Sequence, residues 1–173
     1  MTFHFVSNSE KDTLCFASKI AKNLRQGDIL ILSGALGAGK TKFTEGILTY
    51  FGLQNDISSP TFTIVNEYQK DVTPIFHFDL YRLSDLDEFY AIGGEEYLDR
   101  GISIFEWGEL IEPILKDKSY LKITFIQDYT LESKRLLTIE TFGKAENLLE
   151  GTGISNWNYL AFLLLASAAL QHC

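Results

Sequence analysis

The stretch GALGAGKT, residues 34–41, matches the pattern G-x-x-x-x-G-K-[ST] at every defined position. It follows the apolar run ILIL at 29–32 and precedes apolar residues at helical spacing from Phe43 to Phe51. Glycines let the backbone curl so that N–H groups point at phosphate oxygens, and the helix that follows adds its positive N-terminal end. The order of strand, Gly-rich loop and helix therefore predicts a phosphate-binding loop. A Gly-rich turn with a chance Lys-Thr pair is the alternative.

Two side chains of this loop have chemical roles of their own. Lys40 is predicted to be the point charge for the β- and γ-phosphates, and the Thr41 hydroxyl is a candidate Mg²⁺ ligand. The candidate nucleotide-binding residues of the loop and helix start are Gly34, Gly37, Ala38, Gly39, Lys40, Thr41 and Lys42.

A phosphate loop of this kind needs a carboxylate at the end of a neighbouring strand to orient Mg²⁺ or its water. Asp79 follows the apolar run at 75–78, and Glu106 follows the run at 102–105. The carboxyl ends of parallel strands form the ligand crevice of such folds, so either acid is expected to face the nucleotide. A solvated acid at a strand end is the simpler alternative for each. His77 lies on the same strand face as Asp79, and a structural role is favoured for it over a catalytic one.

The rest of the chain completes an α/β pattern with helices on both sides of a mixed, largely parallel sheet. An edge strand at 3–6 precedes a helix that Ser9 caps and that runs to about Leu24. Further strands are predicted at 62–68, 75–78, 102–105, 121–127 and 136–141, with short helices in 84–100 and at 111–115, and helical structure from 146. We expect one three-layer P-loop domain at 1–143 and a helical extension at 144–173 that packs on it.

Composition limits the function classes. The 173 residues are 46% hydrophobic, with a net charge of −8 and a pI of about 4.8. These values predict one globular domain and exclude an overall basic nucleic-acid coat as the main mode of action. Cys15 and Cys173 have no metal-ligand spacing and are expected to be free thiols in a reducing compartment. The apolar run at 159–170 is shorter than the roughly 20 residues of a membrane span, so we expect a cytoplasmic protein without membrane association.

The class of P-loop protein is narrowed by what the sequence lacks. No N-K-x-D motif for guanine is present. The arginines that a small-molecule kinase would use to clamp a phosphoryl group are scattered along the chain, at Arg25, Arg82, Arg100 and Arg135. From the residues alone, the protein is a small Mg-ATP-binding P-loop protein, either an ATPase or a kinase.

Several motifs occur in the order of one known family. GALGAGKT at 34–41 is followed by SPTF at 59–62, VNEY at 65–68, HFDLYRL at 77–83 and EW at 106–107. Over about residues 2–143 the chain resembles the TsaE (YjeE) family of the bacterial tRNA threonylcarbamoyladenosine pathway. Trp107, in the last motif, is open to two interpretations, a core residue or a contact to the site or a partner.

The resemblance implies a P-loop ATPase that binds ATP and Mg²⁺ and hydrolyses ATP weakly alone. It implies association with the TsaB and TsaD proteins. The net charge of −8 indicates that tRNA is contacted only indirectly, through that complex. Lys40, Asp79 and Glu106 would be the catalytic residues, and Thr41, Asp79 and Glu106 the Mg²⁺ site. It also implies nucleotide contacts by Thr61 in a switch-like loop, by Thr13 near the adenine and by Arg135.

Two other functions stay open. One is a small-molecule P-loop kinase, and the other is a module in which ATP binding gates assembly without required hydrolysis. The extension at 144–173 lies beyond the resemblance, and a partner-docking or self-association helix is the alternative to a helix packed on the sheet.

Overall fold

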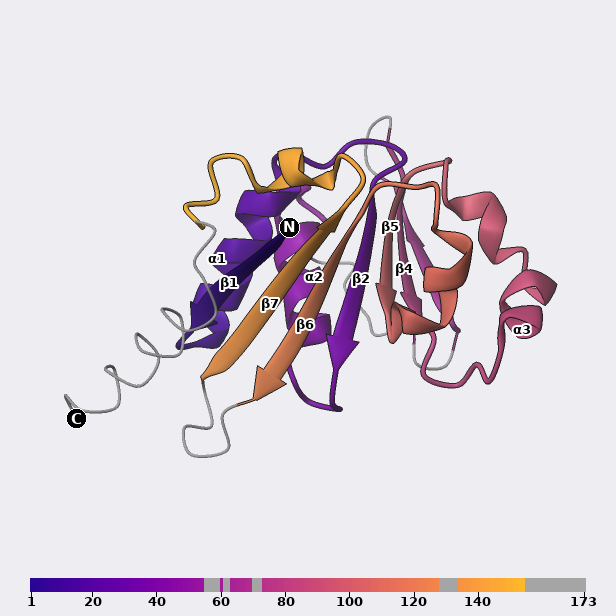
Figure 1. Ribbon diagram of the computed structural model, residues 1–173, viewed down its shortest axis with the longest axis horizontal. Coiled ribbons are helices and arrows are strands. Elements are labelled where there is room, and N and C mark those ends of the chain that lie inside the picture. The colour runs from indigo at the N-terminus through magenta and orange to yellow at the C-terminus, as the bar shows by residue number, and fades with distance from the viewer. Residues whose placement is uncertain (55–59, 61–62, 70–72, 128–133, 155–173) are drawn as a thin grey trace.

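The computed structural model describes residues 1–54, 60, 63–69, 73–127 and 134–154 (Figure 1). Strands and helices alternate along most of this length. The elements are β1 (Thr2–Ser7), α1 (Glu10–Ala21), β2 (Ile29–Gly34), α2 (Lys40–Tyr50), β3 (Val65–Tyr68), β4 (Ile75–Asp79), α3 (Leu86–Ala91), the 3-10 helix η1 (Gly94–Tyr97), β5 (Ile102–Glu106), the 3-10 helix η2 (Gly108–Ile114), β6 (Tyr120–Gln127), β7 (Arg135–Phe142) and the 3-10 helix η3 (Ala145–Leu149).

The strands of the described residues form one sheet in the order β1-β7-β6-β2-β5-β4-β3. The central strands β6, β2, β5 and β4 run parallel, whereas β7, β1 and β3 each pair antiparallel with their neighbour. This confirms the predicted mixed, largely parallel sheet. β2 is buried over Ile29–Leu32 because it lies at the centre and is covered on both faces.

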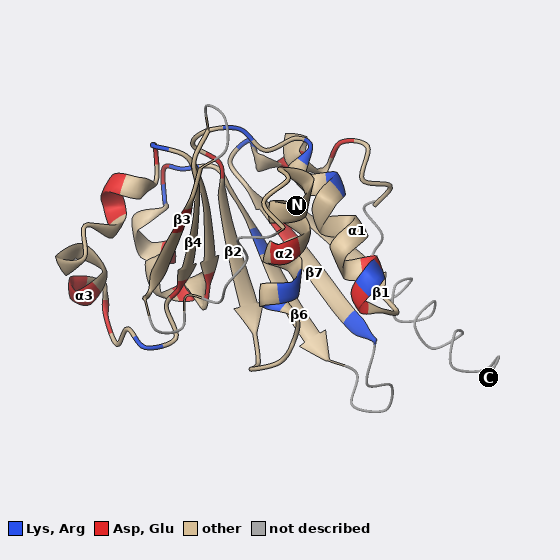
Figure 2. Ribbon diagram, turned by 180° about the vertical axis from the view of Figure 1, so that it is seen from behind, with Lys and Arg blue, Asp and Glu red and all other residues tan. Residues whose placement is uncertain are grey.

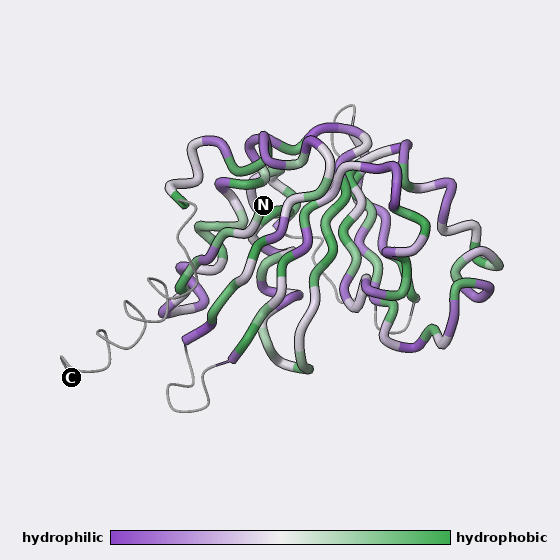
Figure 3. The backbone as a smooth tube through the Cα atoms, viewed as in Figure 1, coloured by the Kyte–Doolittle hydropathy of each residue, from purple (hydrophilic) through white to green (hydrophobic). Residues whose placement is uncertain are grey.

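Helices cover both faces of the sheet (Figures 1 and 2). α1 and α2 pack on one face over a cluster that includes Phe16, Phe43 and Ile47. α3, η1 and η2 pack on the other face, over a cluster that includes Phe78 and Phe105. Figure 3 shows the hydrophobic residues concentrated along the central strands between these layers. The three-layer prediction is confirmed, and the parallel strands end together at one edge.

α1 begins as the sequence predicts but ends earlier. Ser9 caps it, and the Ser9 hydroxyl accepts a hydrogen bond from the Asp12 N–H at 3.1 Å. The helix ends at Ala21 rather than near Leu24. The reason is that the N–H groups of Asn23 and Leu24 bond to carbonyls three residues back, which tightens the final turn.

Two other predicted elements have different bounds. The strand predicted from 62 begins at Val65 because Ile64 has a φ of +67°, and the Thr63 and Ile64 N–H groups bond back to the Pro60 carbonyl. The helix predicted at 111–115 is the 3-10 helix η2, which starts at Gly108 and contains Pro113. Proline removes a donor and clashes with the α-helical backbone, so a regular α-helix is disfavoured there.

The described part of the extension packs on α1. The Asn23 side-chain amide donates to the carbonyls of Leu148 at 3.1 Å and Glu150 at 2.8 Å, and Lys19 Nζ donates to the Thr152 carbonyl at 3.3 Å. The predicted apolar run at 159–170 and Cys173 lie outside the described residues. Among the described residues, none of the helices has the length and apolarity needed to cross a membrane.

Candidate functional site

The Gly-rich loop joins the C-terminal end of β2 to the start of α2. Gly34 has a φ of +134°, and a Cβ there would lie 2.5 Å from the Phe125 carbonyl oxygen. Gly39 caps α2 with a φ of +111°. Only glycine tolerates both positions, so the loop takes this curled path because of its sequence. The first N–H groups of α2 have no acceptor inside the helix, and they face the loop.

A pocket of about 570 Å³ opens over this loop, which is in the usual range for a small-molecule site. Most of the predicted site residues line it. The lining consists of Glu10, Thr13, Leu36, Gly37, Ala38, Gly39, Lys40, Thr41, Lys42, Asp79, Glu106, Trp107 and Arg135. Gly34 is not among these lining residues, and Thr61 lies outside the described residues.

Lys40 is buried at the base of the pocket, with 4% of its surface exposed. Its Nζ donates to the carbonyl oxygens of Gly34 at 2.6 Å and Ala35 at 2.9 Å, and lies 4.0 Å from the centre of the Trp107 ring. Burial lowers the pKa of Lys40, while the nearby carboxylates of Glu106, Glu109 and Asp79 oppose this shift. The ammonium is thus held by weak neutral partners, and anionic phosphate oxygens would be stronger ones.

Glu106 links three elements. One carboxylate oxygen, Oε2, accepts a hydrogen bond from the Thr41 hydroxyl at 3.1 Å, and the other, Oε1, lies 2.9 Å from His77 Nε2. Glu106 and His77 are both buried, at 4% and 1% exposure. The structure thus brings together the loop hydroxyl and one of the two candidate strand-end acids, and the contacts of Glu106 join α2, β5 and β4.

Asp79 is the register partner of Glu106 on the adjacent parallel strand. Its Oδ1 accepts the Tyr81 N–H at 3.1 Å. The Thr41 hydroxyl and the two carboxylates are hard oxygen donors of the kind that Mg²⁺ prefers. Within the described residues, no three His, Cys, Asp or Glu side chains gather to hold a metal by themselves. These donors fit a Mg²⁺ ion whose remaining ligands are oxygens of a bound phosphate and water.

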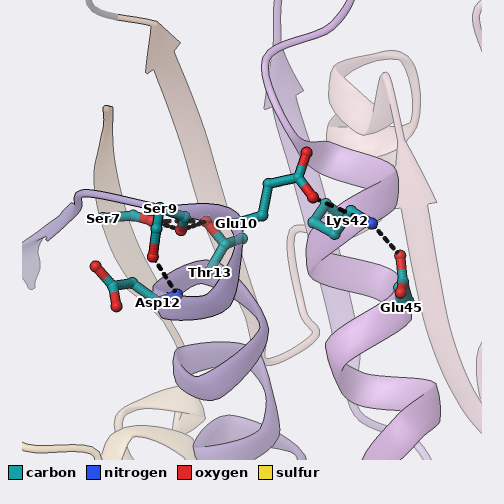
Figure 4. Close-up of polar contacts among 7 residues, drawn as sticks. All are labelled: Ser7, Ser9, Glu10, Asp12, Thr13, Lys42 and Glu45. Atoms are coloured by element: carbon teal, nitrogen blue, oxygen red, sulfur yellow. Dashed lines mark hydrogen bonds and ion pairs between the residues drawn. The ribbon is translucent and has the colours of Figure 1, made fainter. Parts of the chain in front are cut away.

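Glu10 and Thr13, near the start of α1, also line the pocket, and Figure 4 shows Glu10 reaching from α1 toward Lys42 on α2. Thr13 is buried, and its hydroxyl lies 2.7 Å from the Ser7 hydroxyl. Lys42 Nζ lies 2.7 Å from a Glu45 oxygen and 3.6 Å from a Glu10 oxygen. The hydrogen bond to Glu45 raises the pKa of Lys42. The Lys42 side chain is therefore engaged by two acids, unlike that of Lys40.

Arg135, the first residue of β7, contacts the loop and lines the same pocket. Its Nε donates to the Ala38 carbonyl at 3.1 Å, so it braces the loop as well as lining the pocket. Sequence reasoning missed Glu10 and Leu36 as lining residues. Leu36 lies inside the quoted loop pattern but at a variable position, and nothing local to Glu10 indicates that it faces Lys42.

Comparison with known proteins gives a consistent picture. Residues 7–136 match the family model described as "Threonylcarbamoyl adenosine biosynthesis protein TsaE". The chain is similar to the tRNA threonylcarbamoyladenosine biosynthesis protein TsaE of Rickettsia felis, with 36% identity over 84% of each chain. It is also similar to that of Bacillus subtilis, with 34% identity over 80% of this chain and 85% of the relative. Among solved structures, the crystal structure of Bacillus subtilis YdiB superposes with a TM-score of 0.68 at 31% identity, and the match covers 88% of this chain and 94% of that one.

Proposed function

Since the chain belongs to the TsaE family of tRNA threonylcarbamoyladenosine biosynthesis proteins, we propose that it is a Mg²⁺-dependent ATPase of that pathway. The observation that carries the proposal is the hydrogen bond between Thr41 and Glu106, 3.1 Å long, at the mouth of the glycine loop. It joins the hydroxyl and the acid that a P-loop ATPase uses at its metal, beside the buried Lys40.

In this proposal the loop amides and the N-terminus of α2 bind the phosphates, and Lys40 leaves its carbonyl partners for the β- and γ-phosphate oxygens. Thr41 and Glu106 would hold Mg²⁺, with Asp79 directly or through water. The bound metal would supply charge neutralisation at the β- and γ-phosphate oxygens. Asp79, with its Oδ1 fixed by the Tyr81 N–H, or a group of the loop at 59–62, orients the attacking water. Catalysis then rests on preorganised charge and positioning.

We propose that the chain turns over slowly alone and is stimulated by the TsaB and TsaD proteins. Of the described residues that line the pocket, Arg135 is the sole arginine, and its Nε already bonds to the loop. A partner that supplies or orders a cation at the γ-phosphate would raise the rate. Basic residues are scattered over several elements in Figure 2, and the net charge is −8. This supports indirect contact with tRNA through the partners. We further propose that the protein acts in the cytoplasm, without membrane association.

The test measures ATP binding and hydrolysis by the full chain, alone and with TsaB and TsaD. Lys40→Ala and Glu106→Gln are each expected to lower hydrolysis by at least about 100-fold. The exposed residues Lys11 and Glu95 give matched controls, Lys11→Ala and Glu95→Gln, which should behave like the parent. Parent-like hydrolysis by both site variants would contradict the proposal. Transfer of the γ-phosphoryl group to an added metabolite would indicate a kinase instead. Support of tRNA modification by an ATP-binding but hydrolysis-dead variant would indicate an ATP-gated module.

A further inference from the structure

We propose that His77 is a positioning residue that fixes the Glu106 carboxylate for Mg²⁺ binding, an inference that rests on the proposed ATPase function. Glu106 has two carboxylate oxygens, and each has a different partner. Oε1 faces His77 Nε2 at 2.9 Å, and Oε2 faces the Thr41 hydroxyl at 3.1 Å. The His77 contact therefore fixes the orientation of the Glu106 carboxylate, with one oxygen facing the loop.

The hydrogen-bond pattern assigns the tautomer of the imidazole. Donation from the Nε2–H to an ionised carboxylate is the stronger arrangement, and it leaves Nδ1 as the unprotonated nitrogen. Nδ1 is fully buried and has no hydrogen-bond partner among the residues that the structure describes. A buried polar atom without a partner lowers the free energy of unfolding by about 1–3 kcal/mol, so an imidazole that served only to fill the core would destabilise the protein.

The neighbours of His77 on β4 indicate which kind of side chain would serve a purely structural role at this position. Ile75, Phe76 and Phe78 are all buried and apolar, at 1%, 1% and 0% exposure. β4 and β5 lie side by side in the sheet (Figure 1), and His77 reaches across to Glu106. An apolar side chain at this position would avoid the unpaired nitrogen but would leave Oε1 without its donor. The polar contact thus accounts for the histidine.

Fixing a ligand through a hydrogen bond matters because a glutamate side chain otherwise loses rotational freedom when it binds a metal. Removing such outer partners typically weakens metal affinity by about 10–100-fold. His77→Phe is therefore expected to raise the Mg²⁺ concentration for half-maximal binding of the ATP analogue AMPPNP by about tenfold. Binding of AMPPNP in EDTA, which depends on the loop and Lys40, should change little.

The experiment titrates the full chain with AMPPNP by calorimetry in EDTA and at a series of Mg²⁺ concentrations. His77→Gln places an amide N–H near the position of Nε2 and should restore the parent Mg²⁺ dependence. His77→Asn is too short to reach Oε1 and should behave like His77→Phe. Ile75→Val, on the same strand, controls for a purely structural loss, since it should lower the unfolding temperature without changing the Mg²⁺ dependence.

The outcomes separate this inference from the proposed function. If the parent binds AMPPNP with no dependence on Mg²⁺, the proposed function fails. If the parent depends on Mg²⁺ and His77→Phe shows the same dependence, the positioning role is wrong. Should His77→Phe fail to fold, the Gln and Asn variants decide, because equal Mg²⁺ dependence in those two overturns the inference.

Discussion

The Lys40 ammonium lies 4.0 Å from the centre of the Trp107 ring, so the indole covers the lysine of the glycine loop. Trp107 adopts a left-handed φ of +58°, which costs a non-glycine residue roughly 1 kcal/mol. The backbone N–H of Trp107 donates to the Leu32 carbonyl at 2.9 Å, and the centre of the Tyr81 ring lies 5.1 Å from that of the indole. The strained residue is held over the lysine from two sides. Trp107 lines the pocket and also packs against the cluster that includes Phe78 and Phe105, so it makes the contacts of both interpretations.

The first prediction is that Trp107 fluorescence reports nucleotide binding. If Lys40 moves to phosphate, the cation leaves the indole and the emission of Trp107 changes. The chain has a second tryptophan, Trp157, so the measurement uses a Trp157→Phe background. ATP titration with Mg²⁺ should change the emission with the same midpoint as calorimetric binding.

Trp107→Phe, with Trp157 retained, is the control and should give no emission change. Calorimetric binding of ATP to the Trp157→Phe variant without any change in emission would contradict the movement of Lys40.

The second prediction assigns different functions to the two acids, with Glu106 acting in metal binding and Asp79 in the hydrolysis step. Glu106 bonds directly to the Thr41 hydroxyl, whereas Asp79 holds the Tyr81 N–H and is only half-buried. Glu106→Gln should therefore weaken Mg²⁺-dependent ATP binding by about 10-fold or more. Asp79→Asn should keep that binding within about threefold and lower the hydrolysis rate by about 100-fold. Binding constants and single-turnover rates check this, and the reverse pattern would exchange the two roles.

The third prediction concerns the contact between α1 and α2 that supports the loop. A Cβ at Gly46 would lie 2.7 Å from both the Ala17 Cβ and the Leu14 carbonyl oxygen. Backbone atoms cannot move away cheaply, so Gly46→Ala should lower the free energy of unfolding by about 1–3 kcal/mol despite its better helix propensity. Calorimetric unfolding measures this. Thr49→Ala, at an exposed position of α2, should change stability by no more than about 0.5 kcal/mol.

The sequence predicts the positions of the glycine loop and of the strand-end acids because the patterns that indicate them are local. A glycine pattern between an apolar strand and a helix predicts Lys40 and Thr41 at the loop, and an acid after an apolar run predicts Asp79 and Glu106 at the sheet edge. Contacts between distant elements have no such signal. Glu106 meets His77 only because β4 and β5 are neighbours in the sheet.

The sequence pattern also does not predict where a helix ends or which helices are irregular. α1 stops at Ala21 although Leu24, at helical spacing, is still buried. The apolar period reports burial of a side chain, whereas the helix end depends on which carbonyl each N–H reaches. The approach of Glu10 to Lys42 likewise depends on how α1 and α2 pack.

The fourth prediction is a pH dependence at Asp28, far from the loop. Burial raises the pKa of Asp28, and the Arg25 N–H, which donates to Oδ2 at 2.6 Å, and the Arg25 charge only partly offset this. The folded state then binds the proton more tightly than the unfolded state, so this group costs stability above its folded pKa and the cost disappears as the pH falls.

Asp28→Asn removes the charge and keeps an acceptor for the Arg25 N–H. It should therefore stabilise the protein at pH 7, and the gain should vanish below about pH 3.8, the ordinary pKa of aspartate. Urea unfolding at several pH values measures this. Asp117→Asn, at an exposed turn, is the matched control and should show no such trend. A gain that is the same at every pH would show that the charge is not its source.

The fifth prediction contrasts two lysines two residues apart. The buried Lys40 ammonium donates to two neutral carbonyls and lies against an indole, whereas Lys42 is bound by Glu45 at 2.7 Å and Glu10 at 3.6 Å. Lys42 was predicted to bind nucleotide. With its ammonium engaged by acids, its contribution should come from its main-chain N–H, which no side-chain substitution removes.

Lys42→Ala should therefore keep ATP affinity within about threefold, whereas Lys40→Ala should lower it by about 100-fold. Lys42→Ala should cost about 0.3–0.5 kcal/mol of stability, and added salt should reduce this cost because the ion pairs are partly exposed. Calorimetric ATP titration and thermal unfolding at low and high salt measure both effects. A loss of affinity in Lys42→Ala as large as that in Lys40→Ala would mean that the ammonium leaves Glu10 and Glu45 for phosphate, and the ion pairs would then be a resting state of the site.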